Sequence, residues 1–320
     1  MHEISIIGCG EIGSRHLQAI LQLPFPTTVN VVEPSDVAQK KAISRLSEIK
    51  INDNNKINWL KSINELKSKS DLSIIATNSF GRINLISNLL KKDHSRFLIE
   101  KMVCQSSEEY EELISSFKKY DAKGWVNTSR RYFESYKKIN DMIKVNKPLV
   151  MNIISGNYGL GSNAIHFIDL FLWMTKNTTI SLNGNYLSNV LLPSKRGKPF
   201  IEFTGTIIGS NLNSILSISF LPVQNLPYTV NIVQNDLNIM INETNNDGFF
   251  LTKINSKQFK FKNEFTSITT TKIASEILKF DTCKLPTLQE LKNSHNQLFK
   301  IFNTHIEKIT NKTPSLCPIT

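Results

Sequence analysis

Three glycines near the start of the chain are spaced for binding a dinucleotide. Gly8, Gly10 and Gly13 form a G-x-G-x-x-G motif. In such a motif the glycines allow a tight turn, close approach of a pyrophosphate to the backbone, and close packing of the following helix. The N–H groups at the start of that helix then favour the phosphates. The predicted nucleotide contacts in this loop are Gly8, Gly10, Glu11, Ile12 and Gly13.

The motif indicates a dinucleotide-binding site specifically when a strand precedes it, a helix follows it and an acidic residue ends the next strand. Residues 4–7 are a β-branched run suited to a buried strand, and the residues after Gly13 follow helical spacing. Glu33 ends a second apolar run, 20 residues after Gly13. A carboxylate there accepts hydrogen bonds from ribose hydroxyls and repels a 2′-phosphate, so we predict NAD rather than NADP. The alternative is a glycine turn in another type of βαβ unit.

Further candidates stand where later apolar runs of the first half of the chain end. Ligands of open α/β sheets bind at the carboxyl ends of the strands. Lys101 is the most notable residue there, because an amine beside a nicotinamide can donate or accept a proton. The alternative for this residue is a solvated surface lysine. The predicted cofactor contacts at these strand ends are Ala76, Thr77, Asn78, Glu100 and Lys101.

A second group of polar residues lies on an otherwise apolar helix predicted over residues 162–176. Ser162, His166 and Asp169 are spaced to share one face of that helix. Histidine is the side chain whose ordinary pKa best suits proton transfer near neutral pH. The sequence therefore indicates a proton-transfer residue at His166. The alternative is a core histidine that Asp169 satisfies by a hydrogen bond.

The segments that must position these residues change in character along the chain. Strand-like and helix-like segments alternate over the first 127 residues, which predicts an α/β fold with a doubly wound parallel sheet. A β-rich stretch follows over residues 200–254, and its short turns predict a largely antiparallel sheet. A helix is predicted at 286–309. We therefore expect a nucleotide-binding domain at 1–125 and a second domain at 126–320.

Composition narrows the class of protein. A hydrophobic content of 40% with 20% charged residues is ordinary for a globular protein, and the chain contains neither an apolar run long enough to span a membrane nor a signal-peptide pattern. We therefore expect a cytoplasmic protein with no membrane partner. Four cysteines without metal-ligand spacing predict reduced thiols and no metal site. The net charge of +11 is spread along the chain, which argues against a nucleic-acid partner and favours anionic ligands.

Taken together, the motifs resemble the Gfo/Idh/MocA family, named for glucose-fructose oxidoreductase, inositol dehydrogenase and rhizopine catabolism. The resemblance extends over essentially the whole chain. IEKM is similar to the family's Glu-Lys-Pro motif, and HFIDLFLWM carries its His-x-x-Asp pattern. The matching segments are GCGEIGSRHLQAI (8–20), IIATNSFGRINLI (74–86), IEKM (99–102), NTSRRYFESYKKI (127–139) and HFIDLFLWM (166–174).

The resemblance implies a Rossmann domain followed by a domain with an open, largely antiparallel sheet, and a homo-oligomer formed through that sheet. It implies an NAD(P)-dependent oxidoreductase that acts on a CH–OH carbon of a small-molecule sugar or nucleotide sugar. Lys101 and His166 would then handle the proton while hydride moves to or from the nicotinamide. The implied substrate contacts are Arg131, Tyr158, Ser162, Asn163 and Asp169.

Three residues depart from the family pattern. Met102 replaces the proline, which makes a cis peptide at this bond unfavourable. Arg82 replaces a histidine, and Ser162 stands where many members carry an acid. Two alternatives therefore stay open beside the dehydrogenase. One is a redox-neutral epimerase or lyase that retains NAD, and the other is a non-catalytic NAD-binding sensor.

Overall fold

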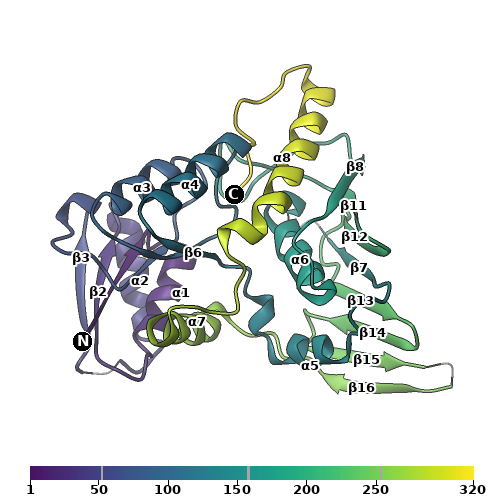
Figure 1. Ribbon diagram of the computed structural model, residues 1–320, viewed down its shortest axis with the longest axis horizontal. Helices are drawn as coiled ribbons and strands as arrows, with labels where there is room; N and C mark the ends of the chain where they lie inside the picture. The colour runs from purple at the N-terminus through teal and green to yellow at the C-terminus, as the bar shows by residue number, and fades with distance from the viewer. Residues whose placement is uncertain (52, 157–158, 253) are drawn as a thin grey trace. The chain divides into compact units, whose positions relative to one another are not determined.

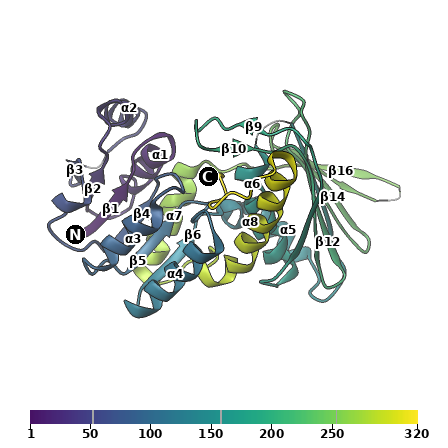
Figure 2. The same ribbon diagram turned by 90° about the horizontal axis from the view of Figure 1, so that it is seen from above.

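The computed structural model divides the chain into two compact units (Figures 1 and 2). It describes residues 1–51, 53–156, 159–252 and 254–320. Residues 264–289, which fall within the second domain expected from the sequence, fold with the N-terminal unit. Unit 1 comprises Met1–Cys104, Glu108–Ser129 and Glu264–Gln289, and unit 2 comprises Gln105–Ser107, Arg130–Asn263 and Glu290–Thr320.

Unit 1 alternates strands and helices, as the sequence predicts. Its strands pair in parallel in the order β3-β2-β1-β4-β5-β6. The order changes direction between β1 and β4, where doubly wound sheets bind nucleotides. Its elements are β1 (His2–Ile7), α1 (Glu11–Ile20), β2 (Thr27–Val32), α2 (Asp36–Leu46), β3 (Lys56–Leu60), the 3₁₀ helix η1 (Ile63–Glu65), β4 (Leu72–Ile75), α3 (Arg82–Leu90), β5 (Arg96–Ile99), α4 (Ser107–Lys119), β6 (Lys123–Val126) and α7 (Thr266–Phe280).

Helix α7 returns from late in the chain to pack beside α1, as Figures 1 and 2 show. Ile273, Ala274 and Ile277 are buried, and Thr271 Oγ1 donates to Ala19 O at 2.8 Å. The sequence pattern of this segment predicts no helix. The segment is rich in threonine, which has a low helix propensity, so packing rather than propensity holds this helix.

Unit 2 is dominated by a large sheet in the order β16-β15-β14-β13-β7-β12-β11-β8. Strands β7 and β12 pair in parallel, and the other neighbours pair antiparallel, so the predicted fold class is confirmed. Its elements are η2 (Ser129–Tyr132), α5 (Glu134–Met142), β7 (Val150–Ser155), α6 (Leu160–Thr175), β8 (Ser181–Leu187), β9 (Leu192–Pro193), β10 (Ile201–Glu202), β11 (Gly205–Asn211), β12 (Ser214–Phe220), β13 (Thr229–Gln234), β14 (Leu237–Asn242), β15 (Asp247–Leu251), β16 (Ser256–Lys260) and α8 (Leu288–Thr310).

The core of unit 2 lies between this sheet and its helices. Figure 2 shows α5, α6 and α8 on one face of the sheet. Strand β12 buries Leu216, Ile218 and Phe220 completely, and serines alternate with them. This alternation is expected for a sheet with one face toward a core. The apolar residues of α6 complete that core, which fixes the helix that carries His166.

Candidate functional site

The glycine-rich turn between β1 and α1 leaves no room for a side chain at Gly13. A Cβ added there would lie 2.0 Å from the carbonyl oxygen of Gly8. Gly8 itself has a φ of +85°, a region that favours glycine, and its N–H donates to Val32 O at 2.9 Å. A Cβ added at Gly10 would meet nothing within 4 Å. Gly10, immediately before α1, therefore has open space beside it, and the start of a helix is where N–H groups favour a phosphate.

Gly13→Ala is expected to lower the free energy of unfolding by about 1–3 kcal/mol, because the added methyl group overpacks the turn. Urea unfolding followed by circular dichroism would measure the change. Gly10→Ala is the matched control, since its methyl group has space, and its unfolding free energy should stay within about 0.5 kcal/mol of the unmodified protein. Equal stability of the two variants would contradict the close contact between Gly13 and Gly8.

Glu33 follows β2, and its carboxylate is held against the glycine turn. Glu33 Oε2 accepts from Cys9 N at 2.7 Å, and Oε1 accepts from Ser35 N at 2.9 Å. The side chain is buried, and each carboxylate oxygen can accept further hydrogen bonds. Burial and the charge of Glu33 raise the pKa of the Cys9 thiol to about 12, so this thiol stays protonated at neutral pH.

Glu11 and Ile12 begin α1, and both are accessible to solvent. Glu11 forms hydrogen-bonded ion pairs with Lys41 and Arg45 of α2. The hydrogen bonds from these two side chains lower the pKa of Glu11 to about 2. Arg45 also donates to Ser14 Oγ at 2.6 Å and to Glu11 O at 2.9 Å. Contacts from basic residues of α2 therefore hold the first turn of α1 in place.

The loop after β4 lies against the glycine turn. Ala76 N donates to Ile7 O at 2.8 Å, and a Cβ added at Gly8 would come within 3.0 Å of Thr77 Cγ2. Thr77 Oγ1 is buried and has no hydrogen-bond partner within the described part of the chain. Asn78 is exposed. The structure thus brings two of the predicted contacts of the β4 loop, Ala76 and Thr77, against the glycine turn.

Glu100 follows β5 and belongs to a buried polar network. His16 Nε2 lies 3.0 Å from Glu100 Oε1, and His16 Nδ1 lies 2.9 Å from Thr270 Oγ1 of α7. Asn127 Nδ2 donates to the same Glu100 oxygen. Burial raises the pKa of Glu100, but the contacts with His16 and Asn127 outweigh it and lower the pKa to about 2. The network fixes the side chain immediately before Lys101.

Lys101 itself is half-buried, while Met102 after it is fully buried. The peptide bond between them is trans, as predicted from the absence of proline. Lys101 therefore lies in a short segment whose neighbours on both sides are enclosed by unit 1.

On α6, His166 is half-buried among apolar residues of the same helix. Ser162 Oγ and Asn163 Nδ2 both donate to Gly159 O, at 3.3 Å and 2.8 Å. The predicted residues Ser162, Asn163 and His166 thus lie within the first two turns of one helix. Tyr158, also predicted as a substrate contact, lies outside the described residues.

A buried carboxylate from another segment occupies the start of α6. Glu202 Oε2 of β10 accepts from Ser162 N at 3.2 Å, and Glu202 is 8% exposed. A carboxylate at this end of a helix is favourable, because the N–H groups there carry partial positive charge. Glu202 therefore places a negative charge one turn before His166.

Asp169 and Arg131 form a bidentate ion pair. Arg131 Nη2 donates to Asp169 Oδ1 at 2.6 Å, and Arg131 Nε donates to Oδ2 at 3.0 Å. Asp169 is completely buried. The structure thus brings these two predicted substrate contacts together, and each neutralises the other's charge. The role of either residue toward a substrate stays a prediction.

The neighbouring arginine has a similar arrangement. Arg130 donates to both carboxylate oxygens of Glu243, at 2.9 Å and 2.7 Å, and Tyr136 OH donates to Glu243 Oε1 at 2.6 Å. The guanidinium lies over the ring of Phe167, 4.1 Å from its centroid. Burial lowers the pKa of Arg130, but the charge and hydrogen bonds of Glu243 outweigh it and raise the pKa. This group therefore supports α6 directly beside His166.

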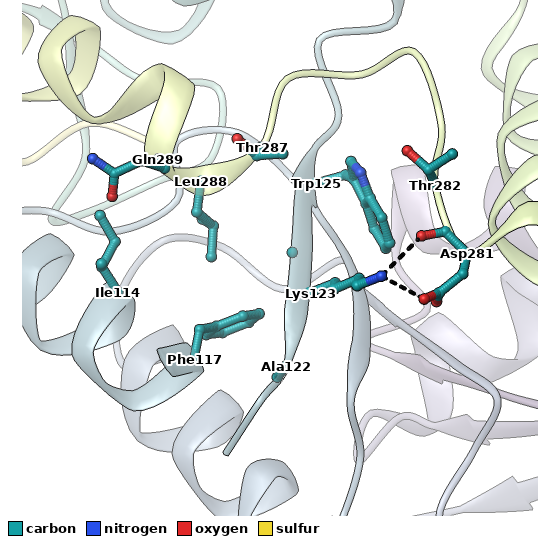
Figure 3. Close-up of a pocket in the computed structure, with 11 residues that line it drawn as sticks. Ile114, Phe117, Ala122, Lys123, Trp125, Asp281, Thr282, Thr287, Leu288 and Gln289 are labelled. Atoms are coloured by element: carbon teal, nitrogen blue, oxygen red, sulfur yellow. Dashed lines mark hydrogen bonds and ion pairs between the residues drawn. The ribbon is translucent and has the colours of Figure 1, made fainter. Parts of the chain in front are cut away.

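A separate pocket of about 450 Å³ lies against β6 in unit 1 (Figure 3). Phe117, Trp125 and Leu288 line its apolar wall. At its edge, Asp281 pairs with Lys123 and accepts from Arg96 Nε at 2.7 Å. Because Lys123 and Arg96 begin their parallel strands, this edge lies at the opposite end of the sheet from the glycine turn. The pocket contains none of the predicted site residues.

Sequence reasoning missed several residues of these networks. Glu202, Glu243 and Thr270 have no local pattern, because each meets partners from distant parts of the chain. His16 and Arg82 stand within segments that carry the family resemblance, and that signal could have marked them. Within the described ranges no group of three or more His, Cys, Asp or Glu side chains could hold a metal ion. In the same part of the chain, no helix has the length and apolar character needed to cross a membrane.

Comparisons with known proteins find a family model that matches the N-terminal part of the chain. Residues 2–128 match the model of the Gfo/Idh/MocA proteins, an oxidoreductase family with an NAD-binding Rossmann fold. No curated protein is significantly similar in sequence. The fold is similar to that of a Gfo/Idh/MocA family oxidoreductase from Vibrio cholerae, with a TM-score of 0.72 and 14% identity, covering 98% of this chain and 100% of that chain.

Two further structural relatives carry more specific names. A UDP-N-acetylglucosamine 3-dehydrogenase from Acidithiobacillus ferrooxidans has a TM-score of 0.72 and 12% identity, covering 96% of this chain and 98% of that chain. A 3-ketoreductase mutant from Actinomadura kijaniata, solved with TDP-benzene and NADP, has a TM-score of 0.68 and 11% identity, covering 94% of this chain and 95% of that chain. At these identities the likeness shows a shared fold.

Proposed function

We propose that this protein is an NAD-dependent sugar oxidoreductase, because residues 2–128 match the model of the Gfo/Idh/MocA family of NAD-binding oxidoreductases. It would move hydride between the nicotinamide and a hydroxyl or carbonyl carbon of a sugar or nucleotide sugar. Lys101 and His166 would handle the proton. The observation that carries the proposal is the Gly8–Gly13 turn with the Glu33 carboxylate held against it.

The residues around the turn fit a dinucleotide. The space beside Gly10 gives a pyrophosphate access to the backbone at the start of α1. The buried Thr77 Oγ1 is a polar group that a bound ligand would satisfy. Glu33 would accept hydrogen bonds from the adenosine ribose and disfavour a 2′-phosphate, which supports NAD over NADP.

Proton transfer is the part of the reaction that the protein itself would supply. Nicotinamide, when bound, supplies or accepts the hydride. Lys101, held between Glu100 and Met102, would donate a proton to the carbonyl oxygen or remove one from the hydroxyl. His166, on α6, would orient that hydroxyl and share its proton.

A nucleotide sugar is the substrate class that we propose to test first. Two structural relatives carry names or ligands of this class, a UDP-sugar dehydrogenase and a ketoreductase solved with a TDP derivative. The net charge of +11 would also favour an anionic substrate through long-range attraction. Arg131, Tyr158, Ser162, Asn163 and Asp169 are the proposed substrate contacts.

The first test is the nucleotide content of the purified protein, measured by mass spectrometry after denaturation, followed by fluorescence titration with NADH and NADPH. Binding of NADH in preference to NADPH is the expected result. Co-purified NAD would support the cofactor assignment and favour the redox-neutral alternative, in which the nucleotide is retained. If the protein bound neither nucleotide, the proposal would fail.

Glu33→Gln is expected to lower the ratio of the NADPH dissociation constant to the NADH dissociation constant about tenfold. This change corresponds to about 1.4 kcal/mol of binding free energy. The physical reason is the loss of repulsion between the carboxylate and the 2′-phosphate, while glutamine keeps a similar size. Parallel fluorescence titrations would measure both constants. Glu65→Gln, at an exposed acid of η1, is the control and should leave the ratio unchanged. An unchanged ratio in Glu33→Gln would show that Glu33 does not face the ribose.

A further inference from the structure

Arg82 is a charged residue at the start of α3 that is almost completely enclosed. Its exposed fraction is 1%, and it is among the largest fully buried side chains of the protein. Burying a guanidinium is costly unless its N–H groups find acceptors. An arginine in this position therefore has a specific set of contacts to maintain.

The guanidinium of Arg82 contacts the backbone of two loops at the carboxyl end of the sheet. Nη1 donates to the carbonyl oxygens of Glu100 and Met102, and Nη2 donates to the carbonyl oxygen of Thr77. The first two carbonyls stand on either side of Lys101. The third belongs to the loop that lies against the glycine turn. One planar group thus ties the Lys101 segment to the β4 loop.

The side chains next to Lys101 are held as well. His16 and Asn127 hold the carboxylate of Glu100, and Met102 is fully buried. No proline restrains the backbone of residues 101–104, which read Lys-Met-Val-Cys. The hydrogen bonds from Arg82 to both flanking carbonyls supply that restraint. Lys101 is left as the half-exposed residue between two fixed neighbours.

We propose that Arg82 is a positioning residue that sets the direction of the Lys101 side chain. The proposal rests on the role of Lys101 in the proposed function. Arginine suits this task because its planar fork of five donors reaches several carbonyls at once, whereas a lysine ammonium is a point donor on a flexible stem. Arg82 would thereby couple the loop that carries the proton-transfer residue to the loop beside the cofactor.

Hydrogen exchange measured by mass spectrometry tests the restraint without a substrate. In Arg82→Met, exchange in the peptide covering residues 100–104 should be about tenfold faster, as expected when a charge-assisted hydrogen bond is lost. Arg82→Lys should show an intermediate increase, and it keeps the test informative if the methionine variant fails to fold. Leu89→Ala is the matched control, since it weakens α3 from a buried position without touching these carbonyls. Its exchange should rise in α3 and stay unchanged at 100–104.

The direction of Lys101 is read out by its rate of acetylation with N-hydroxysuccinimidyl acetate across a range of pH. In Arg82→Met the acetylation rate of Lys101 should change by at least about threefold at one or more pH values. The reason is that a freer backbone changes the surroundings of the amine. Exposed Lys91 provides the internal reference in the same digest. A folded Arg82 variant with unchanged exchange at 100–104 and an unchanged Lys101 profile would overturn the proposal. Failure of the proposed function would appear separately, because the protein without any substitution would then bind no NADH.

Discussion

Lys101→Ala is expected to lower turnover about 10²–10⁴-fold while the dissociation constant for NADH changes only a few-fold, since these are the factors that a general acid or base contributes. Lys101 is half-buried and follows a buried Glu100 network, so removing its amine should leave the glycine turn and Glu33 in place. The nucleotide would still bind, but the proton of the substrate hydroxyl would lose its acceptor.

The measurement is the change in reduced-nicotinamide absorbance with a panel of UDP- and TDP-linked sugars, together with NADH titration of each variant. His166→Ala should behave in the same way, and the double variant should lose less than the product of the two effects, because the residues act on one proton. Lys91→Ala, at an exposed lysine after α3, is the control. Turnover by Lys101→Ala equal to that of the unmodified protein would remove Lys101 from the mechanism. A protein that binds NADH and turns over none of the panel would instead favour the sensor alternative.

Glu243→Gln is expected to reduce the free energy of unfolding by about 3–5 kcal/mol, the range found when one partner of a buried ion pair is removed. Glu243 is 4% exposed and accepts three hydrogen bonds from Arg130 and Tyr136. Glutamine keeps the volume but removes the charge that balances the buried guanidinium. Since Arg130 lies over Phe167, the disturbance should reach α6.

Urea unfolding monitored by circular dichroism would measure this loss. Glu134→Gln is the matched control, because Glu134 forms an exposed i,i+3 ion pair with Lys137 and should contribute no more than about 0.5 kcal/mol. Replacing Arg130 by methionine together with Glu243 by leucine should recover part of the loss, because neither charge then stays buried. A Glu243→Gln variant as stable as Glu134→Gln would contradict the structural importance of this pair.

Local sequence was sufficient to predict the fold class and the strand, turn and helix around the glycine motif. The strand, glycine turn and helix around Gly8–Gly13 lie within about 20 residues, so backbone sterics and hydrophobic periodicity already define them. The alternation of strands and helices in unit 1 and the run of strands in unit 2 predict their sheets in the same way. The His166 helix was predicted because its apolar pattern is long and periodic.

Other features depend on which distant segments meet in space. Helix α7 has weak helix-forming residues, and its packing against α1 places residues 264–289 in unit 1 rather than in the second domain. Glu202 meets the start of α6 and Glu243 meets Arg130 only after the sheet of unit 2 has formed. The three carbonyls held by Arg82 likewise come from two separate loops. Hydrophobic periodicity indicates which side of an element is buried. The strength of an ion pair or hydrogen bond depends instead on the distance between its partners and on their burial. For these residues, only the tertiary structure establishes that distance and that burial.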